Sequence, residues 1–361
     1  GGAQRIATTL INVFGRKNVK WAVCLTGFIV GIALFYEIGF VLLIPLVFTI
    51  AAEAKIPLLE VGIPMAAALS VTHGFLPPHP GPTAIAIIYN ADIGVTLVYG
   101  AIIAIPTAIV AGPVFYNFTK GINPEIPKGL YNPKIFEDHE MPGFGVSVFT
   151  ALVPVVLMAA SAIAKLALDQ SSPVAVALEF LGQPDMALTI SVAIAVYTFG
   201  LARGKKMDEI MNTVKDAILA IAMILLIVGA GGALKQILID SGVGTYIGTL
   251  VADASLSPLV LAWLVAAVIR TACGSATVAA LTAGGIAAPI CAATGANPEL
   301  MVLATGAGSL IFSPPNDPGF WLFKEFFGLT VKETVRTWCA LETIIAIMGL
   351  IGVLVLNTVV A

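Results

Sequence analysis

Two ionisable side chains stand alone inside long apolar stretches of this sequence. Glu37 is the only charged residue of the stretch 21–52, and Arg270 is the only one of the stretch 257–293. A charge in the hydrocarbon of a bilayer costs at least about 2.5–3.5 kcal/mol on insertion scales, so such residues are functional candidates by default. Burial favours the neutral form of a carboxyl group, so we expect Glu37 to carry a proton, with a permanently hydrogen-bonded packing role as the alternative.

Arg270 carries a planar guanidinium whose fork of donors matches a carboxylate. We therefore expect it to bind an acidic ligand. The alternative is that Arg270 forms a buried ion pair with Glu37, which would leave neither side chain free.

Proline breaks two other apolar stretches. Residues 77–82 read Pro-Pro-His-Pro-Gly-Pro, and residues 313–319 read Ser-Pro-Pro-Asn-Asp-Pro-Gly. Proline lacks a backbone N–H and clashes with the preceding turn, so no helix continues through either run. Unpaired backbone groups survive in a membrane only within protein or along a water-filled cavity, so these runs predict two broken helices; the alternative is ordinary aqueous turns.

Polar side chains at the breaks supply the candidate chemistry. His79 could bind a substrate or relay a proton, whereas His73 is assigned a packing or hydrogen-bonding role. Asp317 could carry the proton in place of Glu37, or cap the helix after Pro318. The free N–H groups of helices that start beyond the breaks favour an anion. The predicted substrate-binding residues are His79, Gly81, Thr83, Arg270, Ser275, Thr277 and Asn316, and the predicted proton-coupling residues are Glu37, His79 and Asp317.

The composition defines the class of protein. Of the 361 residues, 58% are hydrophobic and 11% charged, with a mean hydropathy of +0.99. A soluble domain has roughly 25% charged residues, so we expect an all-α polytopic membrane protein. The net charge of −3 provides no basic surface for nucleic acid. The four cysteines show no metal or disulfide spacing, and no nucleophile accompanies the histidines, so neither a metal, a cofactor nor an enzymatic activity is expected.

The sequence repeats itself. Trp21, Pro45, Pro57 and the run 75–81 recur in order as Trp263, Pro289, Pro298 and the run 312–319. Basic residues precede the first copy but not the second, so the copies are predicted to be inverted, an arrangement typical of secondary transporters. Each repeat is predicted to contain a re-entrant hairpin, at about 21–52 with its tip near 35–39, and at about 257–293 with its tip near 273–277. Two closely packed full spans are the alternative.

Polar connections divide the chain. They lie at 120–142, 169–184 and 203–216, and the first and third carry the lysines and arginines. The positive-inside rule places those two in the cytoplasm. We therefore expect a first repeat at 1–118, a linking region at 119–216 with two spans, and a second repeat at 217–361. The chain starts at Gly1 without an initiator Met, and we expect residues to precede it.

The motifs also resemble a known family. The runs 72–86, 274–280, 282–289 and 316–324 closely resemble the gluconate permeases, the gluconate:proton symporter family. One departure is that Pro314 and Pro315 stand where family members usually have His-Val, so no histidine role is transferred to that point.

The resemblance implies uptake of gluconate or a related sugar acid with protons across a bacterial inner membrane. It also implies a homodimer whose mobile transport domain moves like an elevator, with the opening helices of the first repeat absent from this chain. Two other functions stay open: a passive channel or facilitator for small organic anions, and a symporter of another small hydroxy or amino acid such as D-serine.

Overall fold

The computed structural model describes residues 1–15, 18–33, 36–124, 136–169, 171–215, 218 and 257–360. In these residues the regular structure is helical, which confirms the all-α prediction. The tip residue Phe35 and residues 219–256, at the start of the predicted second repeat, lie outside them. The helices up to the first polar connection are α1 (Gly2–Phe14), α2 (Val19–Ala33), α3 (Tyr36–Ala54), α4 (Leu58–Phe75), α5 (Pro80–Tyr89), α6 (Ile93–Ile109), the π-helical η2 (Val110–Val114) and α7 (Tyr116–Thr119).

The remaining helices belong to the linking region and to the last part of the chain. The linking region contains α8 (Phe144–Ala167), α9 (Pro173–Leu181), α10 (Pro184–Ala195), η3 (Val196–Gly200) and η4 (Leu201–Arg203). The last part contains α13 (Pro258–Cys273), α14 (Ala276–Thr294), α15 (Pro298–Gly308), α16 (Pro318–Phe327), α17 (Val331–Thr334), η5 (Val335–Cys339) and α18 (Ala340–Val360).

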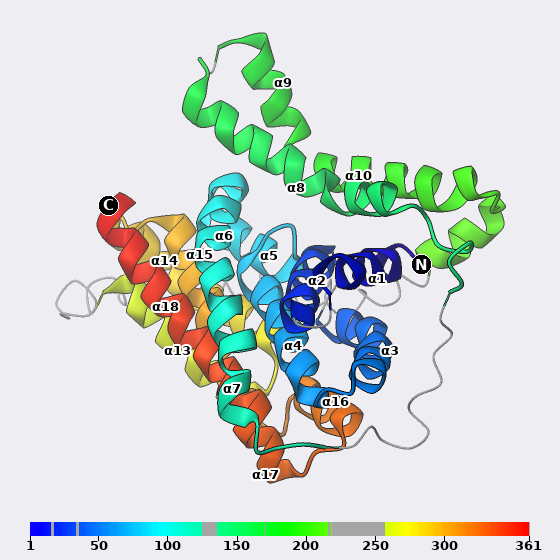
Figure 1. Ribbon diagram of the computed structural model, residues 1–361. Helices are drawn as coiled ribbons and strands as arrows, with labels where there is room; N and C mark the ends of the chain where they lie inside the picture. Colours follow the sequence, from blue (N-terminus) through cyan, green and yellow to red (C-terminus); the bar gives the residue numbers. More distant parts are fainter. Residues whose placement is uncertain are drawn as a thin grey trace.

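Five helical stretches of the described chain are long and apolar enough to span a membrane. They are Leu58–Tyr89, Ile93–Thr119, Asp185–Arg203, Ala276–Thr294 and Val331–Val360. The first of them is the most deeply buried in the protein. It contains the first proline break, and its helices α4 and α5 lie in the middle of the helical body, whereas α9 extends away from that body (Figure 1).

Local sequence sets where these helices begin and end. Proline occupies the first turn of α5, α9, α10, α13, α15 and α16, where its missing N–H costs no hydrogen bond. Helix α9 corrects the prediction of a polar connection at 169–184. Ser172 caps it by accepting the N–H of Ala175, and the run Val-Ala-Val-Ala-Leu continues it.

The two halves of the chain repeat the same helix pairings. Helix α2 packs against α4, and its counterpart α13 packs against α15. Helix α5, beyond the first break, packs against α14, and helix α16, beyond the second break, packs against α3. These two pairs of contacts correspond to one another, whereas in the described chain α5 also packs extensively against α15, and α16 makes no comparably extensive contact with α4. The division into two repeats stays a prediction. Their inverted orientation in the membrane and the re-entrant character of the hairpins stay predictions.

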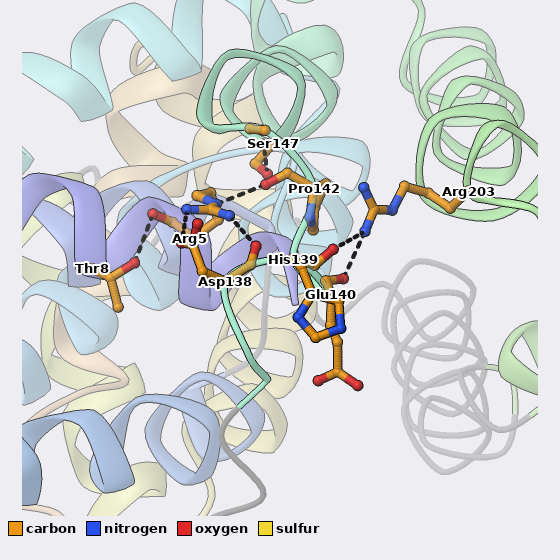
Figure 2. Close-up of polar contacts among 9 residues, drawn as sticks. Arg5, Thr8, Asp138, His139, Glu140, Pro142, Ser147 and Arg203 are labelled. Carbon is orange, nitrogen blue, oxygen red and sulfur yellow. Dashed lines mark hydrogen bonds and ion pairs between the residues drawn. The ribbon is translucent and has the colours of Figure 1, made fainter.

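Two arginines hold the connection in front of α8 (Figure 2). Arg5 of α1 donates to the Pro142 carbonyl at 2.9 Å and to both the carboxylate and the carbonyl of Asp138, at 2.5 and 2.6 Å. Arg203 of η4 donates to the Glu140 carbonyl at 2.8 Å. The first and third polar connections therefore meet in space, and their common placement in the cytoplasm stays a prediction.

Candidate functional site

The first break joins α4 to α5 through a buried, non-helical turn. The chain leaves α4 after Phe75, and the residues from Leu76 to His79 are all buried. The His79 N–H donates to the Leu76 carbonyl at 3.0 Å, and the peptide bond between Pro77 and Pro78 is cis. The break thus lies inside the protein, as its backbone groups require.

His79 forms a pair with His73. Its Nδ1 accepts the Gly81 N–H at 3.4 Å, and its Nε2 lies 3.2 Å from Nδ1 of His73. Because a nitrogen that accepts a backbone N–H carries no proton, this hydrogen bond assigns the proton of a neutral His79 to Nε2, which then donates to His73. The predicted packing or hydrogen-bonding role of His73 agrees with this contact.

The second break joins α15 to α16 through a polar turn around Asp317. The Asp317 carboxylate accepts the Gly319 N–H at 2.8 Å, so the predicted capping role is confirmed. It also accepts the hydroxyl of Ser313, and Trp338 donates its indole N–H to the same hydroxyl oxygen at 2.6 Å. Ser313 and Trp338 were not among the residues predicted from the sequence.

Arg270 lies in the last turn of α13 and is 2% exposed. Its Nη2 donates to the Asp317 carboxylate, so the alternative in which Arg270 pairs with Glu37 is wrong. Its Nε and Nη1 are buried without a hydrogen-bond partner. Unsatisfied buried donors are costly, so two such donors on one guanidinium indicate a place for a ligand.

The tip between α13 and α14 lies against the second break. Gly274 ends α13 with a φ of +68°, and a Cβ at this position would lie 2.6 Å from the backbone of Asn316. Glycine is required here both for the left-handed conformation and for the close approach. Ser275 caps α14 by accepting the Val278 N–H at 3.4 Å.

The same tip also reaches the first break. Thr277, at the start of α14, borders a small gap whose other walls include His73, Gly81 and Pro82. The tip therefore lies between the two breaks, and it brings together most of the residues predicted from the sequence.

Glu37 differs from the other predicted residues. It lies in the first turn of α3 with its side chain exposed in the described chain, although it is close enough to interact electrostatically with His73. The protein itself therefore does not bury this carboxylate, and its role as a proton carrier stays a prediction. Neighbouring Tyr36 is buried and stacks on Trp338 with 4.9 Å between ring centroids.

Few buried polar atoms lack a partner. In the described chain, the buried side-chain atoms that lack a hydrogen bond are Tyr36 Oη, Thr83 Oγ1, Arg270 Nε and Nη1, and Glu342 Oε1. Tyr36 and Thr83 lie in the first turns of α3 and α5, Arg270 in the last turn of α13, and Glu342 within the helical stretch Val331–Val360. Glu342 is not among the site residues predicted from the sequence, although it is the only charged residue of α18, and that signal could have identified it.

A cavity of about 500 Å³ reaches the first break. It is lined by Pro78, His79 and Pro80 and by side chains of α1, α2, α8, α10 and η3, including the hydroxyl residues Ser147, Thr150 and Ser191. Pockets for small ligands have volumes of about 300–1,000 Å³, so this space is large enough for a small organic molecule. Within the described residues, no three histidine, cysteine or acidic side chains gather as metal ligands.

Comparisons with known proteins agree with these features. A high-affinity gluconate transporter of Escherichia coli K12 is 64% identical over all of this chain and 82% of its own length. The L-idonate transporter of the Gnt-II system of the same organism is 56% identical over 99% of this chain, and a gluconate permease of Bacillus subtilis 168 is 51% identical over all of it, covering 82% and 83% of those proteins.

A solved structure shows a related fold. The YdaH transporter of Alcanivorax borkumensis superposes with a TM-score of 0.65 at 20% sequence identity, over 99% of this chain and 80% of that one. At this identity the likeness concerns the fold alone.

The family model described as "GntP family permease" matches residues 1–359. The resemblance found in the proline-rich runs is thereby confirmed. The match, together with the apolar helices, makes the chain a multi-pass protein of the bacterial inner membrane and a transporter rather than an enzyme. This chain belongs to the GntP permease family.

Proposed function

We propose that this protein imports gluconate or a related small sugar acid together with protons, as a secondary transporter of the bacterial inner membrane. The names of the relatives support the substrate class, since they include both gluconate and L-idonate transporters. The observation that carries the proposal is the pair of open donors on buried Arg270.

Arg270 supplies what a sugar-acid carboxylate requires. Nη2 is held by Asp317, which fixes the plane of the guanidinium and leaves Nε and Nη1, on opposite edges of the group, each able to donate a hydrogen bond. A bound carboxylate would accept from one of these donors and a hydroxyl group of the same substrate from the other, which would remove a cost of about 1–3 kcal/mol for each. The anion would also lie next to the tip residues Ser275 and Thr277 and to Asn316.

The hydroxyl groups of the substrate require neutral partners. The Thr83 hydroxyl, in the first turn of α5, is buried without a protein partner and is available to an additional hydroxyl group. We propose that His79 and Gly81, at the same helix start, complete the polar wall of the site.

Proton coupling determines how far the substrate can be accumulated. Gluconate is a monoanion, so its movement with one proton is electrically neutral and one pH unit supplies about 1.4 kcal/mol, or roughly tenfold accumulation. Glu37, Asp317 and His79 are the proton carriers proposed from the sequence, and no resident cofactor is needed. Of these, Asp317 already holds Arg270 in an ion pair and caps α16.

Movement of the site completes the proposal. The tips, the breaks and the half-helices α5 and α16 contact one another across the two repeats, so they can move as one unit. We propose that this unit alternates between the two sides of the membrane by an elevator movement against a homodimeric scaffold.

Uptake into proteoliposomes tests the function. With an imposed inward pH gradient, radiolabelled gluconate should accumulate above its external concentration, and L-idonate should compete more strongly than D-serine. Equilibration without accumulation would support a facilitator, and stronger competition by D-serine would contradict the substrate class.

A further inference from the structure

Glu342 is a buried acid to which neither the family match nor the names of the relatives assign a role. It lies in the first turn of α18, is 1% exposed, and is the only charged residue of that helix. Its Oε1 has no hydrogen-bond partner, while Ser70 of α4 forms a hydrogen bond with the carboxyl group. In the described chain no cation lies within ion-pair distance of it.

The surroundings of Glu342 favour its neutral form in this conformation. The nearest guanidinium, that of Arg270, is paired with Asp317 instead. The other titratable groups that act on Glu342 are Asp317 itself, Tyr36 of α3 and Cys339 of η5, none of which supplies a positive charge. A charged carboxylate that lacks a partner in a dry interior is far costlier than a neutral one.

The remaining charged groups on elements that pack against α18 lie away from Glu342 or have other partners. Arg336 of η5 is exposed. Glu299 of α15 accepts the Asp92 N–H at the start of α6, at 2.9 Å. On α4, Glu60 accepts the Tyr116 hydroxyl at 3.3 Å and His73 lies beside His79. None of them compensates a charge on Glu342.

Hydrogen bonds link the neighbourhood of Glu342 to the proposed substrate site. Trp338, one helical turn earlier on the same face, donates to Ser313, and Ser313 donates to Asp317. Arg270 acts electrostatically on both Asp317 and Glu342. An anion bound to the open donors of Arg270 therefore adds a negative charge beside Glu342.

We propose that Glu342 is the residue that carries the proton imported with each substrate anion. This inference rests on the proposed function and identifies its coupling group. The anion favours the protonated form of Glu342, and by thermodynamic reciprocity the protonated form favours the anion. The Glu342 O–H bond forms with a proton from the outer water and breaks toward the inner water, so substrate anion and proton enter together without net charge.

Glu342→Gln in proteoliposomes tests the proposal with two measurements, accumulation driven by a pH gradient and counterflow exchange of gluconate. A one-unit gradient should give roughly tenfold accumulation by the unmodified protein and none by the variant. Counterflow by the variant should persist, and an internal pH dye should report no proton entry with substrate. Glu325→Gln, which alters an exposed acid bound to Lys324, is the matched control and should accumulate normally.

Different results would overturn the assignment of Glu342 and the proton coupling of the proposed function. Accumulation by Glu342→Gln overturns the assignment, and so does loss of both accumulation and counterflow in a variant present in the membrane at normal levels. If Glu342→Gln does not reach the membrane, Glu342→Asp should retain coupling with a shifted pH dependence of uptake, and an unchanged profile overturns the proposal. If the unmodified protein itself ignores the pH gradient, proton coupling fails for the proposed function as a whole.

Discussion

Arg270 and Asp317, 47 positions apart in the sequence, form a buried ion pair that joins the end of α13 to the start of α16. The pair uses only Nη2 of the guanidinium, and Asp317 simultaneously caps α16 through the Gly319 N–H. One carboxylate therefore fixes both a helix start and the orientation of the proposed anion ligand. The following predictions examine this arrangement and its neighbours.

Replacement of Arg270 by lysine should weaken substrate binding. Lysine keeps the charge and can still reach a carboxylate, but it lacks the planar fork that holds Asp317 and a second carboxylate at once. Loss of one charge-assisted hydrogen bond, about 1.5–3 kcal/mol, corresponds to a roughly 10- to 100-fold rise in KM for gluconate uptake. Arg336→Lys, at an exposed position of η5, is the control, and an unchanged KM in Arg270→Lys would remove Arg270 from the binding site.

Asp317→Ala, which removes the carboxylate, should destabilise the protein more than Asp317→Asn, which only neutralises its charge. Asp317→Asn retains an acceptor for the Gly319 N–H, whereas Asp317→Ala loses the cap, worth about 1 kcal/mol, and also leaves Arg270 buried without its carboxylate, at about 3–5 kcal/mol. Thermal unfolding in detergent should therefore rank Asp317→Ala below Asp317→Asn. The double variant Asp317→Ala with Arg270→Met should recover part of the loss, and equal unfolding temperatures for all three would contradict a buried pair.

Gly274→Ala should impair transport more than Gly295→Ala. Both glycines end helices with left-handed backbones, at φ +68° and +67°, so each substitution incurs a similar conformational cost of roughly 1–2 kcal/mol. Only at Gly274 would the new Cβ collide with the Asn316 backbone, since nothing lies within 4 Å of the corresponding atom at Gly295. Uptake and unfolding should be measured for both, and matching results would show that the tip does not depend on its contact with the second break.

Thr83→Val should lower affinity without lowering stability. The Thr83 hydroxyl has no protein partner to lose, and one neutral hydrogen bond to a substrate hydroxyl is worth about 0.5–1.5 kcal/mol, or roughly a 2- to 13-fold rise in KM. Thr107→Val is the counterpart, because the buried Thr107 hydroxyl donates to the Ile103 carbonyl at 2.7 Å. That variant should leave KM unchanged, and a normal KM in Thr83→Val would place the substrate elsewhere.

Arg5 should contribute to stability mainly through backbone carbonyls. Asp138 is 85% exposed, so its carboxylate adds at most about 1 kcal/mol and Asp138→Asn should unfold at nearly the normal temperature. Arg5→Met also loses the hydrogen bonds to the Pro142 and Asp138 carbonyls and should unfold at a lower temperature (Figure 2). Equal effects of the two variants would show that the exposed ion pair is the important contact.

The sequence by itself determined the class of protein, the family and the places where helices break. Apolar composition requires a membrane, and prolines in the runs 77–82 and 313–319 forbid a helix because the obstacle is local and covalent. The capping role of Asp317 could also be predicted, since an N-cap depends only on residues next to it in the chain.

Only the tertiary structure decided which charges meet. Glu37 and Arg270 are each the single charge of an apolar stretch, yet Arg270 pairs with Asp317, Glu37 is exposed in the described chain, and Glu342 is the buried acid with an open oxygen. The physical reason is that burial and pairing depend on how α3, α13, α16 and α18 pack, and helix packing joins residues across long separations that local sequence does not encode.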